Sequence, residues 1–256
     1  MSFPTPWDIA RNEGSARGWS SFIKYGHNGV ATTTFEPINT GGFLQLPFPS
    51  DAQQLRVVSD DANDTAAGTG ARSVLLNGLD AEGFKISEVV QTNGITAGPL
   101  STRPFWRLID AGVLDSGTYG TALVGSHAGN ITIEDGGGIE WGLIDINGFP
   151  HSRMQSNWLT VPKGQKYWVS SITAGADANK LADFKVIARF NAQTETAPFP
   201  AMLEIFELTG IEAPFQHDFA FPFGPLPEFT DIGFIGRVQI GTGALSADAI
   251  IAVKEF

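Results

Sequence analysis

The segment SDDANDTAAGTGAR, residues Ser59–Arg72, decides how the fold of this chain is interpreted. It consists of small, polar, turn-forming residues and lies between two short apolar runs, Leu55–Val58 and Val74–Leu76. The residues that follow, GLDAEGFKISEVVQTNG at Gly78–Gly94, add a second polar connection and another apolar run. Clusters of Gly, Asp and Asn between short apolar runs are typical of loops that join β-strands. No nucleophile, base or metal-ligand set occurs in the segment, which favours a scaffold over a catalyst.

The same pattern continues toward the C-terminus. Residues 184–190 alternate apolar and polar side chains, which is the period of a half-buried strand. In residues 232–240, Ile232, Phe234, Val238 and Ile240 share one parity, and Gly236 is expected at a bulge or a close approach. Further strands are expected at Phe84–Gln91, Phe105–Ala111, Asn130–Glu134, Ile139–Ile146, Trp168–Ile172, Met202–Leu208, Phe215–Phe221 and Ala249–Val253.

No window of a dozen residues shows a helical apolar stripe. Many short strands separated by Gly and Pro predict an all-β fold, an antiparallel β-sandwich of the jelly-roll type with an extended N-terminal arm. The sandwich region is expected to span residues 51–256. The loop-like segment GFPHSRMQSN at residues 148–157 leaves open a division of this region into two β units.

Residues 1–50 have weak periodicity and carry isolated prolines and aromatic residues. We interpret them as an extended arm that packs over a surface. The alternative is that they form two irregular edge strands of the main domain. Large rings bury much area for little ordering entropy, so the aromatic residues of the arm are candidate anchors to a neighbouring protein. The candidate anchors are Trp7, Trp19, Phe22, Tyr25 and Phe35.

Composition excludes several classes of function. The 256 residues include no Cys, which excludes disulfides, zinc–thiolate sites and cysteine nucleophiles. The formal net charge is −11 with only 16 scattered Lys and Arg, which argues against a nucleic-acid partner. No secretory signal is visible at the start, and no apolar run approaches the roughly 20 residues that span a membrane. We therefore expect a protein without a membrane partner.

Ligand-binding motifs are weak. Asp60, Asp61, Asn63 and Asp64 offer oxygen ligands for calcium, but the EF-hand spacing fails, and a loop of Asx turns is the preferred interpretation. The AAGTGAR glycines lack the Lys-Ser or Lys-Thr of a phosphate-binding loop. We therefore predict no cofactor and no metal.

Catalytic motifs are equally weak. Gly125–His127 resembles a serine hydrolase turn without its full frame. The four histidines, at positions 27, 127, 151 and 217, show no ligand spacing and are expected at surfaces or interfaces. Glu134 and Asp135 are adjacent, so a strand would direct them to opposite faces, and they are expected to begin the following Gly-Gly-Gly turn. We predict no catalytic residues.

Three segments carry a resemblance to a known family. Residues 60–94 (DDANDTAAGTGAR followed by SVLLNGLDAEGFKISEVVQTNG), Trp158–Ile172 (WLTVPKGQKYWVSSI) and Trp7–Asn28 (WDIARNEGSARGWSSFIKYGHN) resemble modules of virion proteins from marine tailed bacteriophages. The matches occur in the same order and cover most of the chain, although residues 100–128 depart from the usual pattern. The resemblance implies a virion structural protein, such as a capsid decoration (cement) protein or another head- or tail-associated component. It carries over no catalytic residues.

Three functions are compared on this basis. The first is a decoration protein, made in the host cytoplasm and located on the capsid surface, whose partners are the major capsid protein and copies of itself as a dimer or trimer. The second is a tail- or fibre-associated adaptor that reads glycans through exposed tryptophans. The third is an enzyme such as a glycosidase, which needs two carboxylates in a cleft. We expect the first, and no enzymatic activity.

Overall fold

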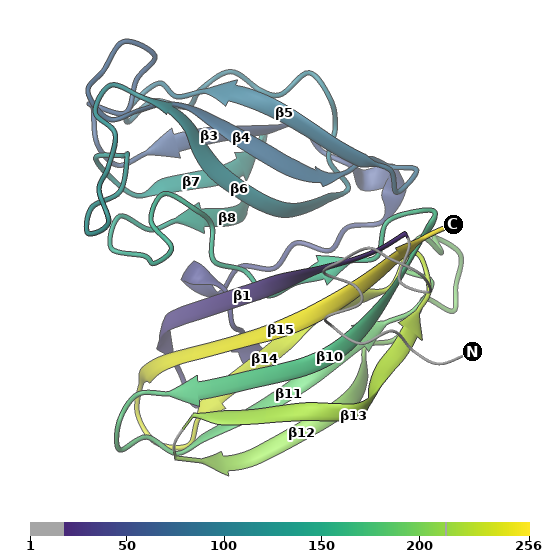
Figure 1. Cartoon of the computed structure of the whole chain (residues 1–256). Helices are drawn as coiled ribbons and strands as arrows, with labels where there is room; N and C mark the ends of the chain where they lie inside the picture. Colours follow the sequence, from purple (N-terminus) through teal and green to yellow (C-terminus); the bar gives the residue numbers. More distant parts are fainter. Residues whose placement is uncertain (1–17, 213) are drawn as a thin grey trace. The chain divides into compact units, whose positions relative to one another are not determined.

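A computed structural model of the chain describes residues 18–212 and 214–256. These residues form antiparallel sheets and two short 3₁₀ turns, and they separate into two compact units (Figure 1). The prediction of an all-β fold with antiparallel sheets is confirmed. Unit 1 contains the described residues up to Gly26, Val30–Ile38 and Asn157–Phe256, and unit 2 contains His27–Gly29 and Asn39–Ser156.

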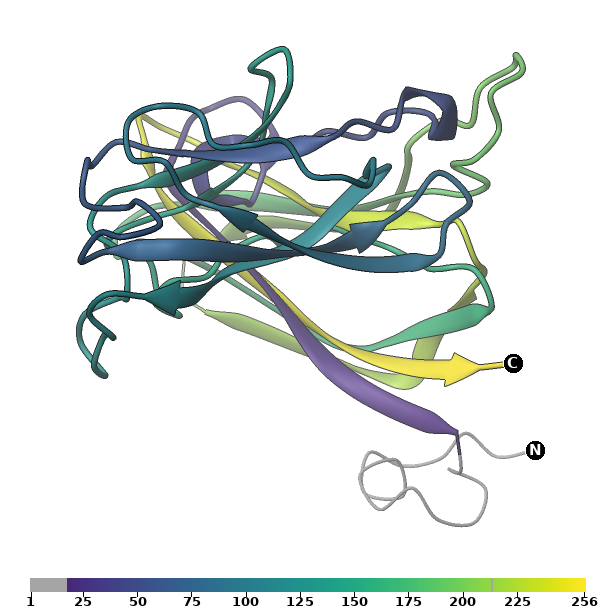
Figure 2. The same cartoon turned by 90° about the horizontal axis from the view of Figure 1, so that it is seen from above.

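Unit 1 consists of two sheets. The first has the strand order β1-β15-β10-β13, and the second has the order β12-β11-β14-β2, with β9 also paired to β14. Both views of the molecule show β1 and β15 side by side (Figures 1 and 2). The strands of unit 1 are β1 Trp19–Ala31, β2 Glu36–Pro37, β9 Leu159–Thr160, β10 Gln165–Ala176, β11 Ala182–Arg189, β12 Leu203–Ile211, β13 Phe215–Leu226, β14 Asp231–Val238 and β15 Gly243–Glu255.

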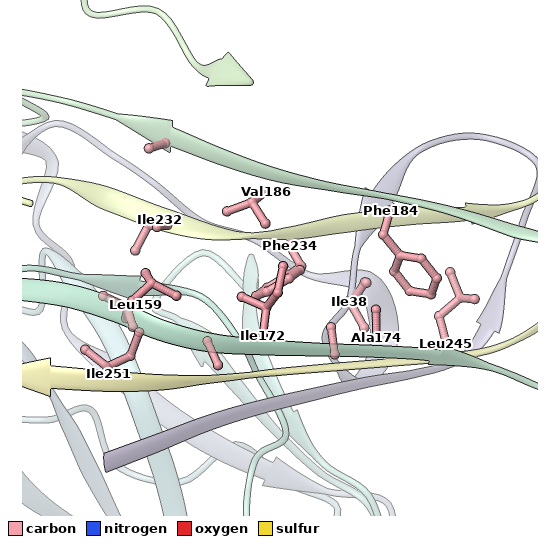
Figure 3. Close-up of a cluster of buried hydrophobic side chains, with 14 of the residues drawn as sticks. Ile38, Leu159, Ile172, Ala174, Phe184, Val186, Ile232, Phe234, Leu245 and Ile251 are labelled. Atoms are coloured by element: carbon pink, nitrogen blue, oxygen red, sulfur yellow. The ribbon is translucent and has the colours of Figure 1, made fainter. Parts of the chain in front are cut away.

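The two sheets of unit 1 share one apolar core. Ile172 and Ala174 of β10 and Ile251 of β15 come from the first sheet, and Phe184 and Phe234 come from the second (Figure 3). Fully burying one such large side chain contributes roughly 1.5–3 kcal/mol, so this alternation of inward apolar residues is what holds the sheets together.

Unit 2 also consists of two sheets around a core of its own. Its sheets have the orders β3-β7-β8 and β5-β4-β6, and both contribute to the core, for example through Val57, Ile133, Val74 and Ile86. The elements of unit 2 are η2 Thr40–Gly42, η3 Pro49–Asp51, β3 Leu55–Ser59, β4 Ala71–Leu79, β5 Lys85–Gln91, β6 Arg107–Ser116, β7 Ile131–Asp135 and β8 Glu140–Ile144.

The prediction of an extended N-terminal arm is wrong for the strands found in the described part of residues 1–50. Residues 19–31 form β1 at the end of one sheet of unit 1, and residues 36–37 form β2 at the end of the other. This arrangement corresponds to the alternative of two edge strands. The reason is that apolar and polar residues do not alternate regularly in β1: Ile23 is 67% exposed, whereas the adjacent Lys24 is only 9% exposed. The sequence pattern therefore gave no indication of this strand. Residues 1–17 lie outside the described residues.

The division of the chain also differs from the predicted one. The sequence interpretation leaves open one boundary near residues 148–157. The chain passes between the units at Ser156–Asn157, inside that segment, but also at Ile38–Asn39, and the short stretch His27–Gly29 of β1 groups with unit 2. The main part of unit 2, Asn39–Ser156, is therefore an insertion between β2 and β9. The first crossing is followed at once by the turn-forming residues Asn39-Thr40-Gly41-Gly42, but the sequence interpretation places them within the arm and not at a boundary.

The close approach predicted at Gly236 is present. A Cβ atom at this position would lie 2.8 Å from Leu245 Cδ1 and 3.1 Å from Ile38 Cδ1, while the pairing of β14 with β11 continues without a bulge. The predicted parity fails at Ile240, which is 81% exposed, because β14 ends at Val238 and the chain then turns toward β15.

Candidate functional site

The Ser59–Arg72 loop of unit 2 is organised by one buried carboxylate. Asp64 is completely buried and accepts hydrogen bonds from Ser59 Oγ (2.6 Å) and from the backbone N–H groups of Ala71 (2.6 Å), Ala128 (2.9 Å) and Gly129 (3.0 Å). Both carboxylate oxygens are therefore used to join this loop to the loop before β7. Asp64 acts as a structural centre whose acceptors are already occupied.

The remaining acidic residues of this loop make local turns. Asp61 Oδ1 accepts from the N–H of Asn63 at 2.7 Å, which is an Asx turn, and Asp60 accepts from the backbone and side chain of Asn130. In the part of the chain that the structure describes, no group of three or more His, Cys, Asp or Glu residues could hold a metal ion. The loop thus has the Asx-turn organisation that was preferred over a calcium site.

A histidine–serine contact joins two neighbouring loops of unit 2. His127 Nδ1 lies 3.1 Å from Ser152 Oγ, and His127 Nε2 lies 3.3 Å from the carbonyl oxygen of Asp145. A carbonyl only accepts, so Nε2 carries the proton and Nδ1 accepts from the Ser152 hydroxyl. Ser152 Oγ in turn accepts the N–H of Ser126 at 2.6 Å. The expectation that each histidine lies at a surface or interface is wrong for His127, which is 5% exposed and contacts loops of its own unit.

This contact has the elements of a nucleophile and a base, and Ser152 has a positive φ of 61°. The geometry nevertheless favours a structural role. The second nitrogen of the imidazole faces a backbone carbonyl instead of a carboxylate, and the Ser152 oxygen already accepts an N–H bond that would weaken it as a nucleophile. We interpret His127 as a clasp between the loop before β7 and the loop after β8.

The clasp predicts a pH dependence of stability. Burial lowers the pKa of His127, so the folded protein binds this proton more weakly than the unfolded chain. The contribution of neutral His127 is therefore complete above about pH 6.5, falls as the pH drops below that value, and stops falling below the pKa of the folded state. We expect His127→Asn to reduce the loss of unfolding free energy between pH 7.5 and 5. Chemical denaturation across this range measures it, and His217→Asn in unit 1 is the control. An unchanged slope in His127→Asn would contradict the clasp.

The adjacent carboxylates Glu134 and Asp135 have separate structural roles. Glu134 pairs with Arg56 of the neighbouring strand, with 2.7 Å between Arg56 Nη2 and Glu134 Oε1. Asp135 Oδ1 accepts from the N–H groups of Gly137 and Ile139, so it holds the Gly-Gly-Gly turn as predicted. The two side chains make no catalytic pair.

The candidate anchors are used mainly within unit 1. Trp19 is 9% exposed and packs on Trp168, with ring centroids 4.6 Å apart. Phe22 contacts the ring of Tyr167 edge-on, with centroids 5.7 Å apart. Tyr25 is half-buried. The rings of Trp19 and Phe22 therefore contribute to the packing of their own unit.

Phe35, the fourth described anchor candidate, makes cation–π contacts with two basic side chains. Lys185 Nζ lies 5.0 Å and Arg237 Cζ lies 4.6 Å from the ring centroid. Trp7 lies outside the described residues. The four described anchor candidates thus do not form one exposed cluster.

The tryptophans do not form a glycan-stacking platform in the described regions. Trp106, Trp141 and Trp158 are 0%, 7% and 4% exposed, and Trp168 is half-buried against Trp19. A sugar-binding aromatic ring needs an open face, which these residues lack. Residues 18–212 and 214–256 likewise contain no helix that is long and apolar enough to cross a membrane.

The open feature of unit 1 is the side formed by β12 and β13, which end the two sheets. We call these two strands, Leu203–Ile211 and Phe215–Leu226, the β12–β13 edge. Among the described strands longer than two residues, only β12 has no buried side chain. The ring centroids of Phe206 in β12 and His217 in β13 lie 5.5 Å apart, and those of His217 and Phe219 lie 4.7 Å apart, yet all three residues are only partly buried. The sequence predicted both strands but gave no sign that their side stays uncovered.

A surface hollow of about 230 Å³ lies at the connections before β11 and after β14 of unit 1. It contains one cation and no carboxylate, so it offers no acid–base pair. Its lining residues are Asn179, Lys180, Leu181, Gln239 and Ile240.

Comparison with known proteins adds no assignment: no protein-family model matches the chain, and no curated protein is detectably similar to it.

Proposed function

We propose that the chain is a structural component of a tailed-phage virion, a capsid decoration protein that works by binding other proteins. The support from sequence is the ordered resemblance of residues 7–28, 60–94 and 158–172 to virion proteins of marine phages. The support from structure is an all-β chain whose charged loop residues stabilise loops and whose open surface is a sheet edge that carries both apolar and acidic residues. Decoration would stabilise an assembled shell by binding it in preference to free subunits.

The observation that carries this proposal is the strand order of unit 1. β9 pairs only beside the main path of its sheet. Without it, the eight strands of unit 1 in chain order are β1, β2 and β10 to β15, and the first strand pairs with the last and the second with the second-last. This order supports a jelly roll, an architecture used by viral capsid proteins. We propose that unit 1 is a jelly-roll sandwich that carries unit 2 as an insertion.

The hydrogen bonding of the buried carboxylates in both units favours a binding role over catalysis. The buried carboxylates Asp64, Asp183 and Asp231 each accept several hydrogen bonds from the protein itself. A glycosidase would instead need two carboxylates converging on an open cleft. We do not propose the glycan-reading adaptor, because the described tryptophans lack open faces.

Reconstitution of phage particles tests the proposed function. Heads stripped of this protein should rebind the purified chain at a fixed number of copies per head and should then release DNA at a higher temperature. An image reconstruction of the decorated head should place both units on the outer shell. Absence of the protein from purified virions, or full recovery of the protein in the unbound fraction after mixing with stripped heads, would overturn the proposal.

A further inference from the structure

The β12–β13 edge has the properties of an unfilled protein contact. Ile205, Phe206 and Leu208 pack against the core of unit 1 but are only partly buried, so the core is incompletely covered along this side. Phe199 and Leu203, just before and at the start of β12, are 54% and 51% exposed. An uncovered edge strand pairs readily with another strand unless it is blocked.

The charge of the edge restricts what can cover it. Residues 190–236 contain seven Asp and Glu and no Lys or Arg. Lys185 of β11 bonds Glu204 and Glu207, while Glu212 and Asp218 are exposed and add further negative charge. Two copies that met through this same edge would bring like charges together, which disfavours a symmetric edge-to-edge contact.

The chain carries a better complement at the opposite end of the same sheet. β1 ends the sheet that β13 ends on the other side, and no Asp or Glu occurs between Gly18 and Phe35. Ile23 of β1 is 67% exposed, and Lys254 Nζ of the adjacent strand lies 5.4 Å from the ring of Trp19. β1 itself is therefore free of acid and exposes Ile23, while its paired strand β15 contributes both Lys254 and the half-buried Asp248.

We propose that the β12–β13 edge of one copy receives the β1 edge of a second copy. The contact is heterologous, so each copy offers one donor and one acceptor edge, and repetition closes a ring or extends a chain. This inference deepens the proposed function, because the decorating species would be this oligomer. It concerns the purified protein alone, so it can fail while binding to particles stands.

The test is self-association of the full-length chain, measured by sedimentation velocity from about 1 to 100 µM at physiological ionic strength. Wild-type protein should associate. Ile23→Glu in the donor edge and Leu203→Glu in the acceptor edge should each weaken association about tenfold or more. Ile23→Lys, similar in length and opposite in charge, should weaken it much less. The controls Ile240→Glu and Leu123→Glu alter side chains that are 81% and 84% exposed outside both edges, and should behave as wild type.

Mixing the two disruptive variants distinguishes this contact from a symmetric one. Ile23→Glu retains an intact acceptor edge and Leu203→Glu retains an intact donor edge, so the mixture should form a heterodimer that grows no further. Circular dichroism verifies that each variant is folded. A monomeric wild-type protein at every concentration, unchanged association in both folded variants, or no heterodimer in the mixture would each overturn the proposal.

Discussion

Asp64→Asn is expected to destabilise unit 2 by about 2–4 kcal/mol. The carboxylate accepts four hydrogen bonds in a site that excludes solvent. Asparagine has the same shape, but its NH₂ group replaces one acceptor oxygen and faces an N–H donor. At least one buried backbone donor, at Gly129 or at Ala71 and Ala128, therefore loses its partner, and a buried unsatisfied group costs about 1–3 kcal/mol in addition to the lost charge-assisted bond. Chemical denaturation measures the change in unfolding free energy.

Hydrogen exchange locates this effect, because the amides of Ala71, Ala128 and Gly129 should exchange faster in Asp64→Asn. Asp61→Asn is the matched control in the same loop. Its side chain makes an Asx turn with Asn63, and asparagine forms such turns equally well, so we expect a change within about 0.5 kcal/mol. Equal stability of the two variants would show that Asp64 does not organise the loop.

The sequence predicted the strands well because their local pattern matches their burial. Residues 184–188 alternate as expected, with Phe184, Val186 and Ala188 inside and Lys185 half-exposed. It predicted β1 poorly because the strand breaks the alternation. Apolar Ile23 points to solvent while Lys24 is buried, and period-two reasoning has no way to detect such a strand.

The polar centres were only partly predictable for a different reason. The Asx turns and the Asp135 turn depend on residues two to four apart, which the sequence displays directly. The bonds of Asp64 to Ala128 and Gly129 cross more than sixty residues, and the clasp of His127 to Ser152 crosses twenty-five. Such contacts depend on tertiary structure, and a single sequence gives no signal for them. The Gly125–His127 motif contains the histidine of the clasp, but its partial likeness to a serine hydrolase turn gave no indication of the contact with Ser152.

Arg189→Met is expected to destabilise unit 1 by about 3–5 kcal/mol. The guanidinium of Arg189 donates two bonds to Asp231 Oδ2, at 2.9 and 2.7 Å, and Thr160 Oγ1 donates to Asp231 Oδ1 at 2.5 Å. The side chains of Arg189 and Asp231 are 13% and 0% exposed. Methionine has a similar length but leaves the buried carboxylate without this cation, and an uncompensated buried charge is among the most costly single changes.

Lys185→Met is the matched control, because Lys185 lies on the same strand β11 and pairs with Glu204 and Glu207 at the surface. Exposed pairs contribute little, so its effect should be far smaller than that of Arg189→Met. The double variant Arg189→Met with Asp231→Asn tests whether the unpaired buried carboxylate causes the loss. Neutralising Asp231 removes this negative charge, so the double variant should recover part of the lost stability. If the double variant is less stable than Arg189→Met by the full cost of Asp231→Asn alone, the two side chains act independently, and the buried ion pair does not stabilise unit 1.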